Sequence, residues 1–254
     1  MSYLDNLISR KASPPRPEKR LQTFIGGDFE ETGKEFLDYF LILGELEPDE
    51  TILDVGCGCG RMTLPLTTFL NEKGQYFGFD IVKESINWCQ KHISAASPNF
   101  HFTHAKIYNQ FYNPKGKIAS DEYIFPYPDK KFDFVILTSV FTHLVPRDME
   151  HYLSEISRTL KKDGRCLITF FLLNEETKKL FKEKPQKFEF IYGEGVYRTI
   201  DPVILESAIS FDETYIREMF TKNNLKIKDP IHYGSWCGRE IHLSFQDIII
   251  AYKD

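Results

Sequence analysis

The chain has 254 residues, of which 42% are hydrophobic and 27% are charged, an ordinary balance for a globular protein. This length suits either one α/β domain with an insertion or two domains. The formal net charge of −5 argues against a polyanionic partner, which would need a clustered positive surface. No apolar run approaches the roughly 18 residues that cross a bilayer, so we expect no membrane partner.

The start of the chain predicts an irregular arm over residues 1–28. Proline in Ser13-Pro14-Pro15-Arg16-Pro17 prevents a helix, and Gly26-Gly27-Asp28 is a turn signal. The first residues lack the charged-then-apolar order of a secretory leader. An odd number of cysteines, five, is typical of a reducing compartment, so we expect a cytoplasmic protein. Cys57 and Cys59 have no further ligands at metal-binding spacing, so we expect no metal site.

Predicted helices and strands alternate along the middle of the chain. Helical spacing of apolar side chains predicts helices within 29–46, 62–70, 83–93 and 147–160. Short apolar runs predict strands at 51–55, 75–80, 100–104, 132–138 and 166–171. Near-continuously apolar strands that alternate with helices predict an α/β fold with a doubly wound, mostly parallel sheet covered on both faces.

This alternation breaks after the fifth predicted strand. Residues 174–210 carry charges, prolines and a Gly-Glu-Gly turn, and a stretch this long inside a compact domain is usually an insertion with a function. We expect a lid-like insertion that covers an acceptor pocket, within one domain that spans residues 29–254. A helix from 211 to 220 capped by Asp212, and two closing strands near 225–231 and 243–252, would complete the chain.

A glycine-rich loop carries the candidate site. Asp54-Val55-Gly56-Cys57-Gly58-Cys59-Gly60 joins a predicted strand to a predicted helix. Glycines let a ligand approach the backbone closely, and a helix start offers unpaired N–H groups. Asp80 lies twenty residues beyond Gly60, at the end of the next predicted strand, where a carboxylate can accept both ribose hydroxyls of a nucleoside.

A dinucleotide is one alternative ligand for such a loop. Its fingerprint, G-x-G-x-x-G, needs a third glycine, but that position falls on Arg61 when counted from Gly56 and on Thr63 when counted from Gly58. A nucleotide-dependent oxidoreductase is therefore disfavoured.

The glycine-rich loop with its flanks, residues 53–61, resembles the first motif of a known family, the class I methyltransferases that use S-adenosylmethionine (SAM). Asp80 resembles the ribose-binding acid of that family, and Phe132-Asp133-Phe134-Val135 with the following Ser139–Leu144 segment resembles its fourth strand and loop. Leu160–Arg165 resembles its turn before the fifth strand, with Lys162 and Asp163 at the usual Pro and Gly. The resemblance covers about residues 36–172 and implies a seven-stranded sheet with an antiparallel final hairpin.

The resemblance also implies a cofactor, SAM, and the residues that would hold it. Backbone contacts would hold the methionine moiety, Asp54 would orient the loop or reach the amino group through water, and Arg61 would place the carboxylate. Asp80 would bind the ribose and Ile81 would pack on the adenine. Lys106 departs from the family, which often has an acid there beside the adenine, because lysine cannot accept a hydrogen bond. The backbone or Asn109 would make that contact instead. The backbone contacts to the methionine moiety would come from Gly56, Gly58 and Gly60.

The resemblance places the loop after the fourth strand near the transferred methyl group. That methyl is already activated, so a base is needed only where the acceptor loses a proton. His143 is the candidate catalytic base, with packing at the start of the next helix as its alternative role. Candidate walls or contacts of an acceptor pocket are Tyr112, Tyr123, Tyr127, His232, Trp236 and Arg239.

The sequence therefore predicts a SAM-dependent methyltransferase. We expect a small-molecule, lipid or sugar acceptor and no nucleic acid, because Thr138-Ser139-Val140-Phe141 stands where nucleic-acid amino-methyltransferases carry Asp/Asn-Pro-Pro-Tyr. A non-catalytic SAM-binding protein is the remaining alternative, and the oligomeric state stays open.

Overall fold

The computed structural model describes residues 14–22, 26–183 and 188–254. Contacts group the chain into two compact units. The first unit comprises the residues up to 106 together with 132–135, and the second comprises 107–131 together with 136–254.

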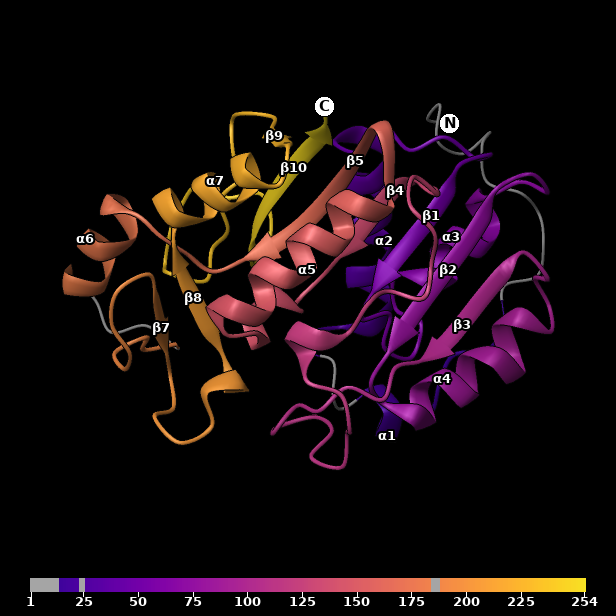
Figure 1. The fold of residues 1–254 in the computed structure, drawn as a ribbon, viewed down its shortest axis with the longest axis horizontal. Helices are drawn as coiled ribbons and strands as arrows, with labels where there is room; N and C mark the ends of the chain where they lie inside the picture. Colours follow the sequence, from indigo (N-terminus) through magenta and orange to yellow (C-terminus); the bar gives the residue numbers. More distant parts are fainter. Residues whose placement is uncertain (1–13, 23–25, 184–187) are drawn as a thin grey trace. The chain divides into compact units, whose positions relative to one another are not determined.

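Parallel strands form the centre of the first unit. β1 (Thr51–Val55) pairs in parallel with β2 (Gln75–Asp80), and β2 pairs in parallel with β3 (Phe100–His104), as Figure 1 shows. These bounds are the predicted ones. The side chains of Ile52, Leu53 and Val55 are fully buried, which explains why β1 reads as a continuous apolar run.

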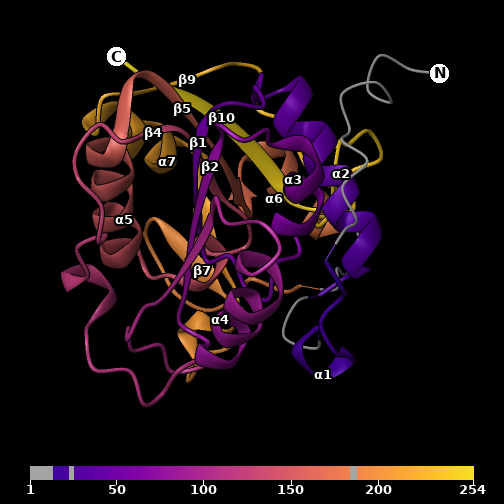
Figure 2. The ribbon, with the colours of Figure 1, turned by 90° about the vertical axis from the view of Figure 1, so that its right-hand side faces the viewer.

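Helices pack against these strands and against each other. α2 (Phe29–Ile42) begins at Asp28, whose carboxylate accepts hydrogen bonds from the backbone N–H groups of Glu30 and Glu31. α3 (Thr63–Phe69) lies beside α2 (Figure 2). α4 (Lys83–Cys89) contacts β2 and β3 and continues as a π-helical turn, η2 (Gln90–Ser94).

One short helix lies within the arm that the sequence predicts to be irregular. α1 (Lys19–Gln22) buries Leu21, and Arg20 forms an ion pair with Glu84. Residues 1–13 and 23–25 of the predicted arm lie outside the described residues. The arm over residues 1–28 therefore stays a prediction.

The second unit contains the antiparallel strands. β5 (Leu160–Phe170) pairs with β10 (Asp247–Lys253), and β10 pairs with β9 (Leu225–Ile227), both antiparallel. With β4 (Phe132–Leu137), the seven strands follow the order β3-β2-β1-β4-β5-β10-β9. The predicted mostly parallel seven-stranded sheet with an antiparallel final hairpin is confirmed.

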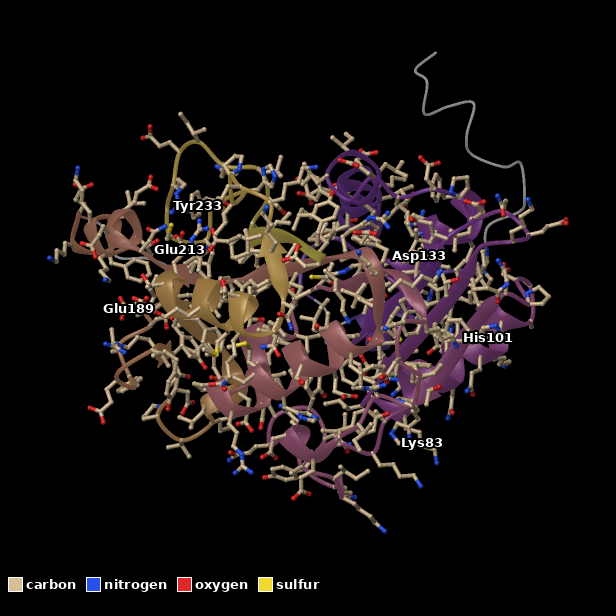
Figure 3. All side chains as sticks on the ribbon, turned by 45° about the horizontal axis from the view of Figure 1, so that its top comes forward. Lys83, His101, Asp133, Glu189, Glu213 and Tyr233 are labelled. Carbon is tan, nitrogen blue, oxygen red and sulfur yellow. The ribbon has the colours of Figure 1, made fainter. Side chains whose placement is uncertain are left out.

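Two longer helices of the second unit follow their sequence signals. α5 (Pro146–Thr159) begins with proline and buries Tyr152, Leu153 and Ile156. α7 (Glu213–Lys222) is capped by Asp212, which accepts from the N–H groups of Thr214 and Tyr215, as predicted. At the start of α7 the Tyr233 hydroxyl donates to Glu213 at 3.0 Å, and Figure 3 labels both residues.

A second sheet occupies the segment predicted to be an insertion. It has the order β6-β8-β7, from β6 (Leu172–Leu173), β8 (Ile209–Asp212) and β7 (Tyr197–Thr199), and α6 (Glu175–Glu183) lies between β6 and β7 along the chain. The sequence predicts no strand here and a helix that begins at Phe211, which instead lies in β8. Strands of two to four residues have too little periodicity to detect, because long-range pairing stabilises them.

Several short helices complete the second unit. They are the 3-10 turns η3 (Ser120–Glu122), η4 (Phe141–His143) and η5 (Leu205–Ser207). Within the described ranges, none of the helices is long and apolar enough to cross a bilayer. The five cysteines are free and buried, and no metal-binding group of three or more His, Cys, Asp or Glu occurs in the described part of the chain.

Candidate functional site

The glycine-rich loop turns directly at the end of β1. Gly56, Gly58 and Gly60 have φ angles of 80°, 53° and 88°, a left-handed region that side chains disfavour. The backbone N–H groups of Gly56 and Cys57 both donate to the carbonyl of Phe79 in β2, at 2.9 and 3.1 Å. The glycines are therefore required by the path of the chain, and the loop is bonded to the neighbouring strand.

Gly60 allows a sensitive test of this loop. An added Cβ at Gly60 would lie 2.9 Å from Cδ1 of Ile93, in addition to the strain of its φ. We expect Gly60→Ala to lower the free energy of unfolding by about 1–3 kcal/mol in a urea titration. Gly195→Ala is the matched control, because Gly195 has a φ of 65° with no atom near its added Cβ. An equal effect of both substitutions on the free energy of unfolding would show that the contact with Ile93 does not contribute to the loss of stability.

Asp80 holds the loop through its carboxylate. Oδ2 accepts from the N–H of Gly58 at 2.8 Å, and Oδ1 accepts from the N–H of Val82 at 2.7 Å. Burial raises the pKa of Asp80, and the N–H groups of Val82 and Gly58 oppose that rise because they favour the carboxylate. Each oxygen keeps a further lone pair for a ligand hydroxyl. Ile81, the next residue, is partly exposed.

Asp54 is fully buried beneath the same loop. Its Oδ2 accepts from the Tyr76 hydroxyl at 2.6 Å, and that hydroxyl lies 2.8 Å from Oγ1 of Thr63. Burial raises the pKa of Asp54 to about 7, against the Tyr76 hydrogen bond that lowers it. Oδ1 has no hydrogen-bond partner among the described residues. A buried carboxyl oxygen of this kind is costly unless a ligand or water engages it.

Arg61 is a second buried polar group with an unused atom. Nη1 donates to the carbonyl of Gly26 at 2.5 Å, and the residue is 9% exposed. Nε has no partner in the described part of the chain. Burial lowers the pKa of Arg61 to about 10, so the guanidinium stays charged at neutral pH.

Asn109, which the sequence offered as an adenine contact in place of the acid that Lys106 replaces, has another role in the structure. Lys106 is exposed. In the second unit, Asn109 is buried, and its Oδ1 accepts from the N–H groups of Phe111 and Tyr112 at 3.1 and 2.8 Å. The Asn109 carbonyl oxygen thus shapes its own turn, which removes the support for an adenine contact by that atom.

His143 of the second unit lies in η4 and has a defined tautomer. Nδ1 lies 2.7 Å from the carbonyl of Glu206, which can only accept, so Nδ1 carries the proton. Nε2 is then the acceptor and lies 3.3 Å from the hydroxyl of Tyr112. Burial lowers the pKa of His143, so the ring is neutral at pH 7. This is the protonation state that a general base needs.

Three of the candidate acceptor contacts, Tyr123, Trp236 and Arg239, make contacts within the second unit. Trp236 is 2% exposed and donates from Nε1 to the buried carboxylate of Asp247 at 2.8 Å. Arg239 is paired with Glu176 and stacks over the ring of Tyr233 at 4.6 Å. Tyr123 packs against Phe125. Sequence patterns do not reveal Asp247, the centre of this network, because an acid inside an apolar strand gives no periodic signal.

Comparisons with known proteins show the family of this chain. A family model described as a methyltransferase domain matches residues 46–224. The chain is 29% identical over 119 residues to the tRNA N(3)-cytidine methyltransferase METTL2 of Gallus gallus, covering 46% of this chain and 29% of that protein. It is 32% identical over 124 residues to the ubiquinone/menaquinone biosynthesis C-methyltransferase UbiE of Wigglesworthia glossinidia brevipalpis, covering 49% and 44%. The chain thus spans less than half the length of these relatives.

A solved structure supports the fold. Magnesium protoporphyrin IX methyltransferase (ChlM) of Synechocystis PCC 6803, solved with bound S-adenosylhomocysteine (SAH), superposes with a TM-score of 0.56 at 15% identity, over 93% of this chain and 94% of that one.

These relatives correct one expectation. Proteins named tRNA N(3)-cytidine methyltransferases from Gallus gallus, Bos taurus and Homo sapiens are among them, so the prediction of no nucleic-acid partner is wrong, and the expected small-molecule, lipid or sugar acceptor is not confirmed. Net charge describes the whole chain, whereas nucleic-acid binding depends on local clusters of positive charge. The absent Asp/Asn-Pro-Pro-Tyr motif excludes one group of nucleic-acid methyltransferases only.

Proposed function

Because the chain belongs to the family of SAM-dependent methyltransferases, we propose that it binds SAM with the loop of the first unit and methylates a nucleobase in RNA. When bound, SAM supplies a methyl group that its sulfonium already activates. The residues around the loop bind SAM and orient its methyl group toward the substrate. A general base is needed only when the attacking atom of the substrate carries a proton.

The observation that carries the cofactor assignment is the pair of buried, unpaired atoms beneath the loop. Asp54 Oδ1 can accept from the ammonium of the methionine moiety, directly or through water, and Arg61 Nε can donate to its carboxylate. The three positive-φ glycines place no side chain between the loop and this moiety, while their own N–H groups are bonded to Phe79, Asp80 and Cys57. Acid and base are thus matched to the opposite charges of an amino acid.

The nucleoside part of SAM fits the end of β2. Asp80 can accept the two ribose hydroxyls with lone pairs that the Gly58 and Val82 N–H groups leave available. Ile81 is partly exposed beside it and can pack on the adenine. Asp80 therefore has two tasks, to shape the loop and to bind the ribose.

His143 is the proposed general base. Its neutral Nε2 can take the proton that an amino or ring nitrogen of a base releases on methylation. We expect His143→Gln to lower kcat about 100-fold and to leave the Kd for SAH unchanged. Because the pKa of His143 lies below 6.5, the rate of the wild-type enzyme should persist below pH 6.5 and fall only at lower pH.

The variant should lose that acid limb. His232→Gln is the control, because burial also lowers the pKa of His232 but we assign it no proton transfer. A His143→Gln enzyme with the wild-type kcat and pH profile would exclude a role as base and leave His143 a packing residue.

The acceptor class is drawn from the relatives. Those named tRNA N(3)-cytidine methyltransferases favour a nucleobase. The similarity to UbiE, at 32% identity, favours a second candidate, the ring carbon of a quinol-type compound. Both candidates are planar rings, and they differ in whether the methylated product is RNA.

One experiment separates them. The purified chain is incubated with SAM labelled with tritium on the methyl group, and with either unmodified transfer-RNA transcripts or a quinol-containing lipid extract. Label that becomes acid-soluble after ribonuclease treatment supports the RNA acceptor, whereas label in the organic phase supports the quinol. Calorimetric titration with SAH, run in parallel, tests the cofactor site. Binding of SAH without labelled product in either arm would refute both acceptors and keep the cofactor site.

A further inference from the structure

Residues 107–118 form a compact loop in the second unit. Its ends are joined by the N–H of Tyr108, which donates to the carbonyl of Ile118 at 2.7 Å, and by Nδ2 of Asn113, which donates to the carbonyl of Ile107 at 2.8 Å. Asn109 caps the turn between them, as described above. An added Cβ at Gly116 would lie 2.1 Å from the Ile107 carbonyl oxygen, so the loop closes tightly on itself. Such a loop presents its exposed side chains in fixed positions.

The side chains that this loop exposes are aromatic and basic. Tyr108 is 45% exposed and Phe111 is 51% exposed. Lys115 and Lys117 are also exposed. The loop contains no Asp or Glu and therefore has a formal charge of +2 in a chain whose net charge is −5. Proteins bind single-stranded nucleic acid with aromatic rings, which stack on the bases, and with basic side chains, which pair with the phosphates.

Ring contacts link the exposed Phe111 to the proposed base through the half-buried Tyr112. The rings of Phe111 and Tyr112 lie 4.8 Å apart, edge to face, and the rings of Tyr112 and His143 lie 5.1 Å apart. The Tyr112 hydroxyl also bonds to Nε2 of His143 at 3.3 Å. A ring that stacks on Phe111 is therefore two side chains away from Nε2 of His143.

We infer that the 107–118 loop is the RNA-binding platform of this enzyme. A base of a single-stranded segment stacks on Phe111, and Lys115 and Lys117 pair with the flanking phosphates. This inference rests on the proposed RNA acceptor and adds where the chain binds it. The positive charge of the loop favours RNA over an uncharged quinol, which would gain nothing from the two lysines.

The charge part is tested with two double variants of equal net charge. Lys115→Glu/Lys117→Glu changes the loop, and Lys162→Glu/Lys226→Glu changes two exposed lysines elsewhere. Affinity for an unmodified transfer-RNA transcript is measured by fluorescence anisotropy between 50 and 200 mM salt. We expect the loop variant to bind at least tenfold more weakly and to lose about 1.4 from the slope of log K against log salt, and the control to keep both. Equal effects of the two variants would overturn the inference, because they would reflect net charge alone.

The stacking part is tested at Phe111. Phe111→Ala should weaken RNA binding at least about fivefold, Phe111→Tyr should restore it, and Val203→Ala, which truncates an apolar residue 75% exposed, should have no effect. Calorimetry with SAH checks that each variant is folded and keeps its cofactor affinity. Wild-type RNA affinity in Phe111→Ala would overturn the inference, as would binding of the loop to anionic phosphatidylglycerol vesicles but not to RNA.

The tritium assay distinguishes the two levels of failure. If the wild-type enzyme labels RNA and Phe111→Ala does so with the same KM, the platform is wrong and the proposed function stands. If the wild-type enzyme labels no RNA, the proposed acceptor is wrong and the platform falls with it.

Discussion

Asp80→Ala should weaken the binding of SAH by at least tenfold. The substitution removes a charge-assisted acceptor for two ribose hydroxyls, and such contacts contribute about 1.5–3 kcal/mol each. It also frees the N–H groups of Gly58 and Val82, which Asp80 now bonds at 2.8 and 2.7 Å, so the loop loses its fixed shape. Calorimetric titration of the folded variant measures the change.

Asp133→Ala is the matched control for this experiment. Asp133, labelled in Figure 3, also accepts a backbone hydrogen bond within the first unit, from the N–H of Thr51 at 2.9 Å. This bond lies at the start of β1, whereas the glycine-rich loop follows the end of β1. We expect Asp133→Ala to lower the free energy of unfolding and to keep the wild-type affinity for SAH. An Asp80→Ala protein with unchanged affinity would refute the ribose role.

Asp54→Asn should stabilise the ligand-free protein at alkaline pH while it weakens SAH binding about tenfold. The pKa of Asp54 is raised from 3.8 to about 7 by burial, so the folded state holds its proton more tightly than the unfolded state. The stability that this proton contributes is complete below pH 3.8 and is lost as the pH rises through 7. Asparagine keeps an oxygen for the Tyr76 hydroxyl and never ionises.

The advantage of Asp54→Asn should therefore grow with pH. We expect the difference in unfolding free energy between variant and wild type to increase by about 2 kcal/mol from pH 5 to pH 8, in urea titrations of protein stripped of bound ligand. Thr63→Val, which removes the hydroxyl beside Tyr76 but no ionising group, should show no such pH dependence. A pH-independent difference for Asp54→Asn would mean that Asp54 is ionised at low cost.

Local sequence signals predict the strands of the first unit because short-range patterns define where these strands begin and end. β1, β2 and β3 have the predicted bounds, since each is an apolar run ended by a glycine, a charge or a turn. The departures from the family motif are also readable. Asp163 stands at a usual glycine and adopts a φ of 62°, which Asp tolerates better than most residues.

Side-chain pairing decided what the sequence left open. The sequence leaves two roles open for His143, a base or a packing residue, and only the carbonyl of Glu206, 63 residues away, fixes its proton on Nδ1. Asn109 was a candidate for the adenine, but its own turn uses its oxygen. Trp236 and Arg239 were candidate acceptor contacts, but the buried carboxylate of Asp247 engages both.

The sequence by itself determined the class of fold, because apolar runs and glycine turns are short-range features set by backbone geometry, and its resemblance to the class I methyltransferases implied the cofactor and the reaction. Only the tertiary structure decided which polar atoms remain unpaired beneath the loop, how His143 is protonated, and which aromatic side chains are exposed near it. Those properties depend on partners far apart in the chain, whose approach no local pattern encodes.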